Sequence, residues 1–178
     1  VRQVDWHDGF TAAAGLTVYT ARTYPEEYWN RTAFISEPTG HLTAAMTLHP
    51  DGATFKARYG WNLVASDDEW CAPIDAQVGP DGHVWVTDWY AFIVQHNPTP
   101  SGFKTGKGGA YETELRDKAR GRIYRVVYTK AKNEKPFTLK DATPEKLVEA
   151  LKHPNMTWRL HAQRLLVTDA KPDAIGAL

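Results

Sequence analysis

The amino-acid sequence predicts a mainly β chain with an α-helical C-terminal segment, and two observations support this fold class. Up to about Val127, short apolar runs are separated by turns that contain glycine, which is typical of all-β proteins. Beyond about Lys130, apolar residues recur with the period of an amphipathic helix. The 178 residues suffice for one domain with its own core, or for one domain and part of a second.

Two turns with the letters Pro-Asp-Gly punctuate the β region, at residues 50–52 and 80–82. Proline presets φ, aspartate bonds its own backbone, and glycine accepts a positive φ. After the second turn, Val84 and Val86 share one strand face, and His83, Trp85 and Thr87 share the other. Because both faces carry bulky side chains, we expect a sheet that is covered on both sides.

The strand from His83 to Asp88 is followed by a long excursion over residues 89–121, before the next strand in "GRIYRV". Loops of this length are usually either functional or disordered. We therefore expect the excursion to line or cover a site.

The charged stretch "KAKNEKP" predicts a linker over residues 129–142, between a β region at 1–128 and a helical region at 143–178. Thr143 is the expected N-cap of a first helix, with Pro144 at its first position. Asn155 is the expected cap of a second helix, and a third is expected near Pro172. The second helix should be amphipathic, with one face made of Trp158, Ala162, Leu165 and Leu166. Such short helices need neighbours, so we expect the opening of a helical repeat array in a piece of a longer protein.

Composition disfavours several classes of protein. Lysine plus arginine and aspartate plus glutamate both number 21, whereas nucleic-acid binders usually carry a basic excess. No apolar run is long enough to cross a membrane. The single cysteine, Cys71, excludes an internal disulfide, and the seven histidines lack a metal-binding spacing.

Four candidate site residues lie at the end of the strand and in the excursion. Asp88 could bind a cation, orient a histidine or act as a base, or it could cap the turn through its own backbone. Tyr90 could contact a ligand or pack within the sheet. His96, beside Asn97, is the best acid/base candidate because imidazole titrates near neutrality, and its alternative is a loop histidine bonded to a carbonyl.

A basic cluster precedes and enters the next strand, and it consists of Arg116, Lys118, Arg120 and Arg122. These side chains could hold an acidic quinone or a sugar acid, or they could form a solvated strand edge near Asp117. The carboxylates at 67–69 could bind calcium or form an acidic surface loop. "TGKGG" at 105–109 is not a phosphate-binding loop, because no serine or threonine follows its lysine.

Four segments of the chain carry a family resemblance: "YPEEYWNRTAFISEPTGHL", "YGWNLVASDDEWCAPIDAQVGPDGHVWVTDWYAFIVQHNPTPSGF", "RDKARGRIYRVVY" and "HPNMTWRLHAQRLLV". Together they resemble the membrane-bound dehydrogenases of planctomycete-type bacteria, also called PVC-type haem-binding proteins. The resemblance implies the last blades of a β-propeller, related to soluble quinone-dependent sugar dehydrogenases, followed by the start of HEAT-type repeats. It also implies a cytochrome c domain later in the protein. Cys71 is followed by Ala72 and Pro73, so the haem motif itself is absent here.

The resemblance implies an extracytoplasmic or periplasmic dehydrogenase, associated with a membrane through regions outside this span. It would oxidise a sugar or related alcohol with a quinone of the PQQ type and calcium, and pass electrons to a haem domain of the same chain. His96 and Asp88 would then be catalytic, and Tyr90, Asn97, Arg116 and Arg122 would bind the cofactor. Two alternatives stay open: a non-enzymatic scaffold of propeller and repeats, and a metal-dependent hydrolase of the lactonase type.

Overall fold

The computed structural model describes residues 9–94, 99, 101–106, 113–132 and 136–168. The chain is mainly β, with two antiparallel sheets and two short C-terminal helices. It divides into two compact units. The first comprises Val1–Thr17, Ala33–Gln77 and Trp85–Val126, and the second comprises Val18–Thr32, Val78–Val84 and Val127–Leu178.

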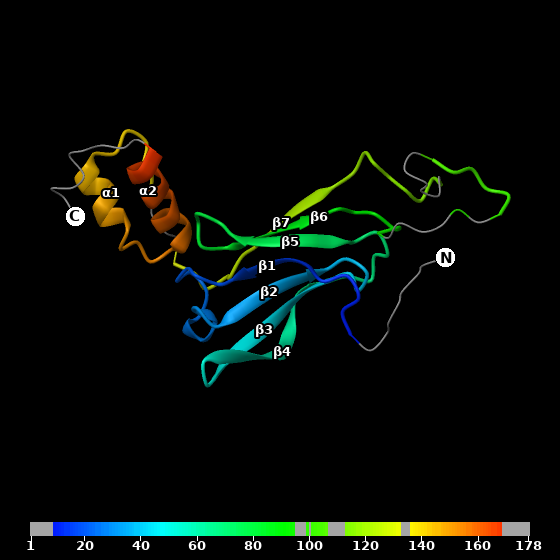
Figure 1. Cartoon of the computed structure of the whole chain (residues 1–178), viewed down its shortest axis with the longest axis horizontal. Coiled ribbons are helices and arrows are strands. Elements are labelled where there is room, and N and C mark those ends of the chain that lie inside the picture. Colours follow the sequence, from blue (N-terminus) through cyan, green and yellow to red (C-terminus); the bar gives the residue numbers. More distant parts are fainter. Residues whose placement is uncertain (1–8, 95–98, 100, 107–112, 133–135, 169–178) are drawn as a thin grey trace. The chain divides into compact units, whose positions relative to one another are not determined.

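The first sheet is a meander in which four consecutive strands lie in the order of the sequence (Figure 1). Its strands are β1 (Ala14–Val18), β2 (Thr32–Glu37), β3 (Leu42–Asp51) and β4 (Thr54–Ala65). A short 3₁₀ helix, η1 (Glu26–Tyr28), lies between the first two strands. Phe34, Thr43 and Ala44 are fully buried and belong to the core of the first unit.

The hairpin of β3 and β4 is the longest element of this sheet, and it turns at the first Pro-Asp-Gly sequence. Asp51 pairs with Thr54, and Gly52 has a φ of +61°, as the turn chemistry predicted. Register shifts between Thr43 and Ala44, and between Ala45 and Met46, bend the hairpin.

The second sheet also follows sequence order, with β5 (Pro73–Val78), β6 (Val84–Asp88) and β7 (Arg122–Val126). The predicted strand before the excursion and the return strand after it are therefore confirmed. Val84 and Val86 are fully buried, but Trp85 on the opposite face is 38% exposed. The expectation that this strand is covered on both faces is wrong at Trp85, where the guanidinium of Arg125 lies 5.8 Å from the ring centroid.

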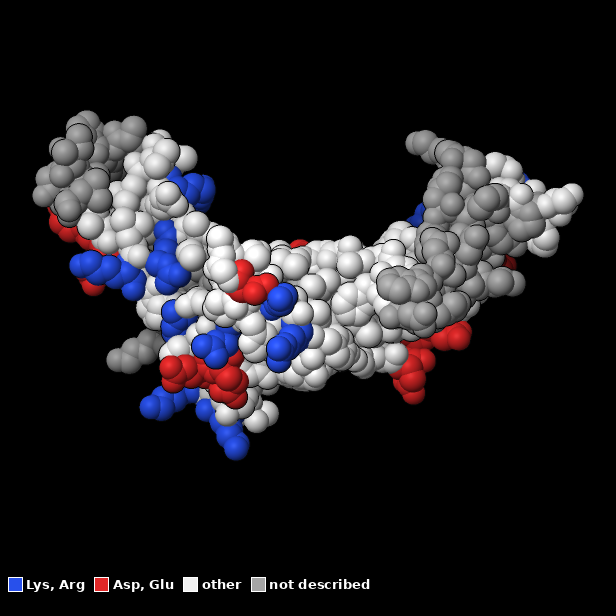
Figure 2. Space-filling view, turned by 60° about the horizontal axis from the view of Figure 1, so that its bottom comes forward, with Lys and Arg blue, Asp and Glu red and all other residues white. Residues whose placement is uncertain are grey.

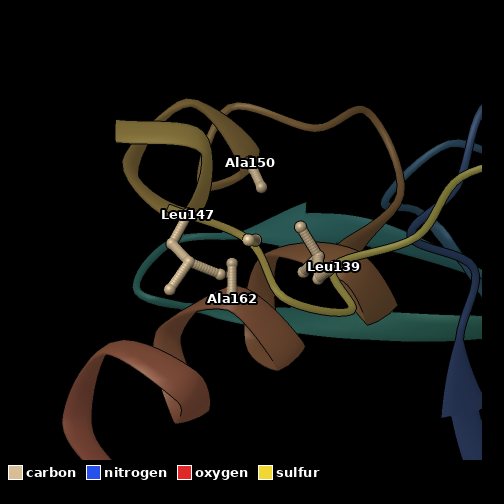
Figure 3. Packing of buried hydrophobic residues seen from close by; sticks show 5 residues of the cluster. Leu139, Leu147, Ala150 and Ala162 are labelled. Carbon is tan, nitrogen blue, oxygen red and sulfur yellow. The ribbon is translucent and has the colours of Figure 1, made fainter. Parts of the chain in front are cut away.

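Both helices begin at the capping residues that the sequence predicts. Thr143 caps α1 (Pro144–Ala150), and its side chain accepts a hydrogen bond from the Lys146 N–H. Asn155 precedes α2 (Met156–Thr168), and its side-chain oxygen accepts from the Thr157 N–H at 3.0 Å. Ala162 of the predicted α2 face joins a buried cluster with Leu139, Ala142, Leu147 and Ala150 (Figure 3). The rest of that face, Trp158, Leu165 and Leu166, packs against this cluster. The third helix, expected near Pro172, falls outside the described residues.

The start of α2 is bonded to the second Pro-Asp-Gly turn, within the second unit. The Asn155 side-chain amide donates to the Gly79 carbonyl at 2.8 Å, and Asn155 is fully buried. The Trp158 indole N–H donates to the Pro80 carbonyl at 2.9 Å. These bonds join the helices to a turn more than 70 positions earlier in the sequence.

Basic and acidic side chains are intermingled on the face of the molecule seen in Figure 2. Among the residues that the structure describes, no helix combines the length and hydrophobicity needed to cross a bilayer.

Candidate functional site

Asp88, the last residue of β6, is a buried carboxylate with a complete set of hydrogen bonds. Its side chain is 3% exposed. One oxygen, Oδ1, accepts from the backbone N–H groups of Ala72 at 2.7 Å and Tyr90 at 2.8 Å. The other oxygen, Oδ2, accepts from the hydroxyl of Tyr124 at 2.9 Å. Ionised carboxylates accept such bonds more strongly than neutral groups do, which offsets the cost of burial.

These bonds explain how the sequence shapes the end of the second sheet. The central strand of that sheet is β6, and Asp88 bonds to Ala72 just before β5 and to Tyr124 on β7. The bond to Tyr90 closes a local turn in which Tyr90 has a φ of +53°. A tyrosine in this left-handed region is strained, so the surrounding bonds must hold it there. The interpretation of Asp88 as a turn cap is therefore favoured.

A partly exposed group of side chains lies next to this buried carboxylate, and we call it the Arg122 platform. It consists of Asp68, Trp70, Tyr90 and Arg122. The Arg122 guanidinium carbon lies 3.5 Å from the centroid of the Tyr90 ring. The same guanidinium is 3.4 Å from the carboxylate of Asp68. The ring of Trp70 is 6.0 Å from that of Tyr90, at an angle of 33°.

Tyr124 links the buried carboxylate to the platform. Its hydroxyl donates to Asp88 and accepts from Nη1 of Arg122 at 3.4 Å. Arg122 and Tyr124 are two positions apart on β7, so they share one face of the strand. The orientation of Arg122 is therefore coupled through one hydroxyl to the interior of the unit.

The hydrogen bonds of the platform shift the pKa values of its members. The backbone N–H of Trp70 lowers the pKa of Asp68, and Tyr90 and Arg122 lower it further. The hydrogen bond with Tyr124 raises the pKa of Arg122, so its charge is permanent. Burial raises the pKa of Tyr124, which keeps its hydroxyl protonated as a donor to Asp88. The platform thus presents a fixed cation beside a carboxylate that ionises readily.

Cys71 is a free, buried cysteine whose thiol is affected by the charge of Asp88. It is 1% exposed. Burial raises the pKa of its thiol to about 11, and the negative charge of Asp88 adds to this rise. Because the thiolate is the reactive form, we expect a protonated, unreactive cysteine. The carbonyl of Cys71 contacts Nδ1 of His41, a short hydrogen bond within the first unit.

The structure brings together three of the six predicted site residues: Asp88, Tyr90 and Arg122. Arg116 is half-buried in the excursion, and the hydrogen bonds that join Asp88 to Arg122 do not include it. His96 and Asn97 lie outside the described residues, so their roles stay predictions.

Sequence reasoning missed Tyr124, Trp70 and the role of Asp68 as a partner of Arg122. Tyr124 had a readable signal, because it follows Arg122 with the two-residue period of a strand. Trp70 and Asp68 had none, since they come from a loop more than 50 positions before Arg122.

A planar ligand that carries a carboxylate could bind the platform if that carboxylate replaced Asp68 as the partner of Arg122. Arginine binds carboxylates through paired donors, and aromatic rings beside it offer apolar faces for a flat molecule. The residues present therefore fit the carboxylates of a quinone of the PQQ type. Its calcium would need further oxygen ligands, because no group of three or more histidine, cysteine, aspartate or glutamate residues within the described ranges could hold a metal ion.

Comparisons with known proteins identify a family but no characterised relative. A search of the curated proteins and a search of the solved structures found no match. The model of the family described as "Domain of unknown function (DUF7133)" matches residues 1–130, and the chain therefore belongs to this family.

Proposed function

We propose that the chain is part of an extracytoplasmic dehydrogenase that oxidises a sugar or related alcohol with a bound quinone. Electrons would pass to a haem domain outside this span. The sheets support the architecture that this proposal requires, which is a β-propeller followed by helical repeats. Propeller blades are four-stranded antiparallel meanders, and β1 to β4 form a meander of this kind. Strands β5 to β7 would then belong to the next blade.

The Arg122 platform is the single observation that carries the proposed function. It combines a permanent cation at the start of β7, where the long excursion ends, with two aromatic rings and a carboxylate. Loops at strand ends build the ligand sites of propellers. The family resemblance supplies the reaction class, and the platform supplies the residues that would receive the cofactor.

Each residue has a distinct role in this proposal. When bound, the quinone supplies a two-electron acceptor for the alcohol carbon. Arg122 binds a cofactor carboxylate, and Tyr90 and Trp70 shape the adjoining surface. Asp88 positions Arg122 through Tyr124, because its own oxygens are already engaged. His96 is the proposed group that takes the proton of the substrate hydroxyl.

A second candidate function is a binding scaffold without chemistry of its own. The observation in its favour is that Asp88 accepts three hydrogen bonds. These bonds explain why Asp88 is buried, so its burial requires no catalytic role. In that case the Arg122 platform would be a stabilised surface cluster.

The test uses the full-length protein, loaded with quinone and assayed on a panel of sugars with an artificial electron acceptor. We expect quinone-dependent oxidation of at least one sugar. Replacing Arg122 by alanine should weaken quinone dependence, seen as a higher quinone concentration for half-maximal rate. His96→Ala should lower turnover by about 100-fold.

Arg125→Ala is the matched control, because Arg125 lies on the same strand and also stacks over an aromatic ring, that of Trp85. It should leave quinone dependence unchanged. Oxidation that does not depend on quinone would contradict the proposed cofactor. The absence of oxidation with every sugar in the panel would favour the scaffold.

A further inference from the structure

The second unit contains an open pocket that none of the preceding interpretations uses. It is formed within residues 22–31 and has a volume of about 470 Å³. Its lining is strongly polar apart from one indole, and it consists of Arg22, Glu26, Glu27, Trp29, Asn30 and Arg31.

The indole of this pocket is held in place by backbone groups. The Trp29 ring N–H donates to the Tyr24 carbonyl at 2.7 Å, and the Arg22 guanidinium lies 4.9 Å from the ring centroid. Arg22 is itself fixed by a bond from Nη1 to the Ala21 carbonyl at 2.8 Å. These contacts hold the Trp29 side chain in a defined orientation, with Arg22 over its ring.

The pocket stands on a buried base of tyrosines. Tyr19 is fully buried and stacks on Tyr24 with ring centroids 4.7 Å apart. The backbone N–H of Asn30 donates to the Tyr19 carbonyl at 2.8 Å, and Asn30 has a φ of +57°. Because rigid walls lose little entropy on binding, such a pocket is preorganised for a ligand.

The charges around the pocket cancel. Two arginines and two glutamates line it, so its formal charge is zero. A site for phosphate or a sugar acid would carry an excess of cations. The lining instead offers carboxylate acceptors, guanidinium donors and an amide around one aromatic ring.

We propose that this pocket binds a neutral pyranose sugar. A pyranose ring has an apolar C–H surface that packs on an indole, and hydroxyl groups that both donate and accept hydrogen bonds. Glu26 and Glu27 are exposed at the rim and can accept from hydroxyls, while Arg22 and Arg31 can donate to them. The pocket shares no residue with the Arg122 platform, so this inference goes beyond the proposed function and does not depend on it.

The experiment is calorimetric titration of the full chain with three neutral hexasaccharides, namely cellohexaose, maltohexaose and mannohexaose. Hexagalacturonate serves as the charged comparison. We expect at least one neutral probe to bind. Trp29→Ala should abolish this binding, and the double variant E26A/E27A should weaken it at least tenfold. Trp61→Ala, which removes an exposed tryptophan on β4, should leave it unchanged.

Circular dichroism establishes that each variant is folded. If Trp29→Ala is not, the double variant at the exposed rim decides the matter. The inference is overturned if no neutral hexasaccharide binds at millimolar concentration, or if the double variant binds as tightly as the wild-type chain. It is also overturned if hexagalacturonate binds more tightly than every neutral probe, because the arginines would then dominate recognition. Dehydrogenase activity does not enter this test.

Discussion

Glu37 and Asp88 are two buried carboxylates with the same structural task and different surroundings. Each is the last residue of a strand in the first unit, and they are 2% and 3% exposed. Glu37 accepts from the backbone N–H of Ala12 at 2.8 Å and from the hydroxyl of Thr39 at 2.5 Å, and Gly40 also donates to it. Asp88 likewise accepts from backbone N–H groups.

The difference between them lies in one hydroxyl group. Asp88 also accepts from Tyr124, whose oxygen is 3.4 Å from the guanidinium of Arg122. Among the described residues, the hydrogen-bond partners of Glu37 are three backbone N–H groups and the hydroxyl groups of Thr11 and Thr39, with no cation among them. Both carboxylates hold a turn, but only Asp88 is connected to an exposed cation. We infer that both buried carboxylates have structural roles. The residue that we propose to bind a ligand is Arg122, the exposed cation near Asp88.

The largest expected effect is the loss of stability in Asp88→Ala. The substitution leaves two backbone N–H groups and the part-buried hydroxyl of Tyr124 without their acceptor, and each loss costs up to roughly 1–3 kcal/mol. We expect a loss of about 4 kcal/mol in the free energy of unfolding, measured by urea denaturation. Asp67→Ala, in an exposed loop position, is the control and should change stability by less than about 0.5 kcal/mol. A loss below about 1 kcal/mol for Asp88→Ala would show that these bonds contribute little.

Glu37→Ala should have a comparable but smaller effect, about 3 kcal/mol, because the segment at residues 11 and 12 is only half-buried. It should differ from Asp88→Ala in its effect on the Arg122 platform. At a temperature where both variants are folded, ligand binding at the platform should be unchanged in Glu37→Ala. If Glu37→Ala impairs that binding as strongly as Asp88→Ala, the distinction between the two carboxylates is wrong.

The reactivity of the Cys71 thiol should depend on Asp88 and not on Glu37. Its pKa is raised to about 11, partly by the charge of Asp88. Burial is the main cause of this rise, so Asp88→Asn should lower the pKa only in part and should increase the rate of reaction with an aromatic disulfide reagent at pH 8.5. Glu37→Gln should leave the rate within about twofold of the wild-type value. Equal acceleration in both variants would point to general loosening of the unit.

The same thiol predicts how stability depends on pH. Its pKa is 9.0 as an ordinary cysteine and about 11 in the folded chain, so the folded state holds the proton more tightly. The stabilisation of the folded state that follows from the raised pKa is complete below pH 9, and it is lost as the pH rises through 11. Cys71→Ala should therefore lose less stability between pH 9 and pH 11 than the wild-type chain does. Parallel stability curves for the two proteins, recorded by thermal denaturation, would contradict the raised pKa.

The smallest expected effect on stability is that of Arg122→Ala. The guanidinium is partly exposed, and exposed cation–π contacts contribute about 0.5–1 kcal/mol. We expect a loss in urea denaturation that is much smaller than that of Asp88→Ala. A loss of stability as large as that of Asp88→Ala would show that Arg122 is a structural residue. The contrast between the buried carboxylate and the exposed cation would then be wrong.

The parts of the fold that depend on local chemistry could be predicted from the sequence. Thr143 and Pro144 mark the start of α1 because capping depends on adjacent residues, and Asn155 does the same for α2. The turn at Gly52 follows from its preference for positive φ. The end of β6 at Asp88 was also readable, because the alternating apolar residues stop there.

The site could be predicted only in part, because its partners are distant in sequence. Asp88 bonds to Ala72 and Tyr124, which are 16 and 36 positions away. No local pattern indicates which of two neighbouring strands will supply a donor. The pocket around Trp29 was missed for a different reason: its residues are contiguous, but their arrangement depends on the buried tyrosines beneath them.

The most direct test of the central claim is the affinity of the full-length protein for the quinone, measured by equilibrium titration in the wild type, Arg122→Ala and Arg125→Ala. A charge-assisted hydrogen bond contributes roughly 1.5–3 kcal/mol, so Arg122→Ala should weaken binding at least about tenfold. Its melting temperature should stay within about 3 °C of the wild-type value. Arg125→Ala should bind the quinone as the wild type does. Unchanged affinity in Arg122→Ala, or an equal loss in both variants, would contradict the assignment of ligand binding to the exposed cation beside Asp88.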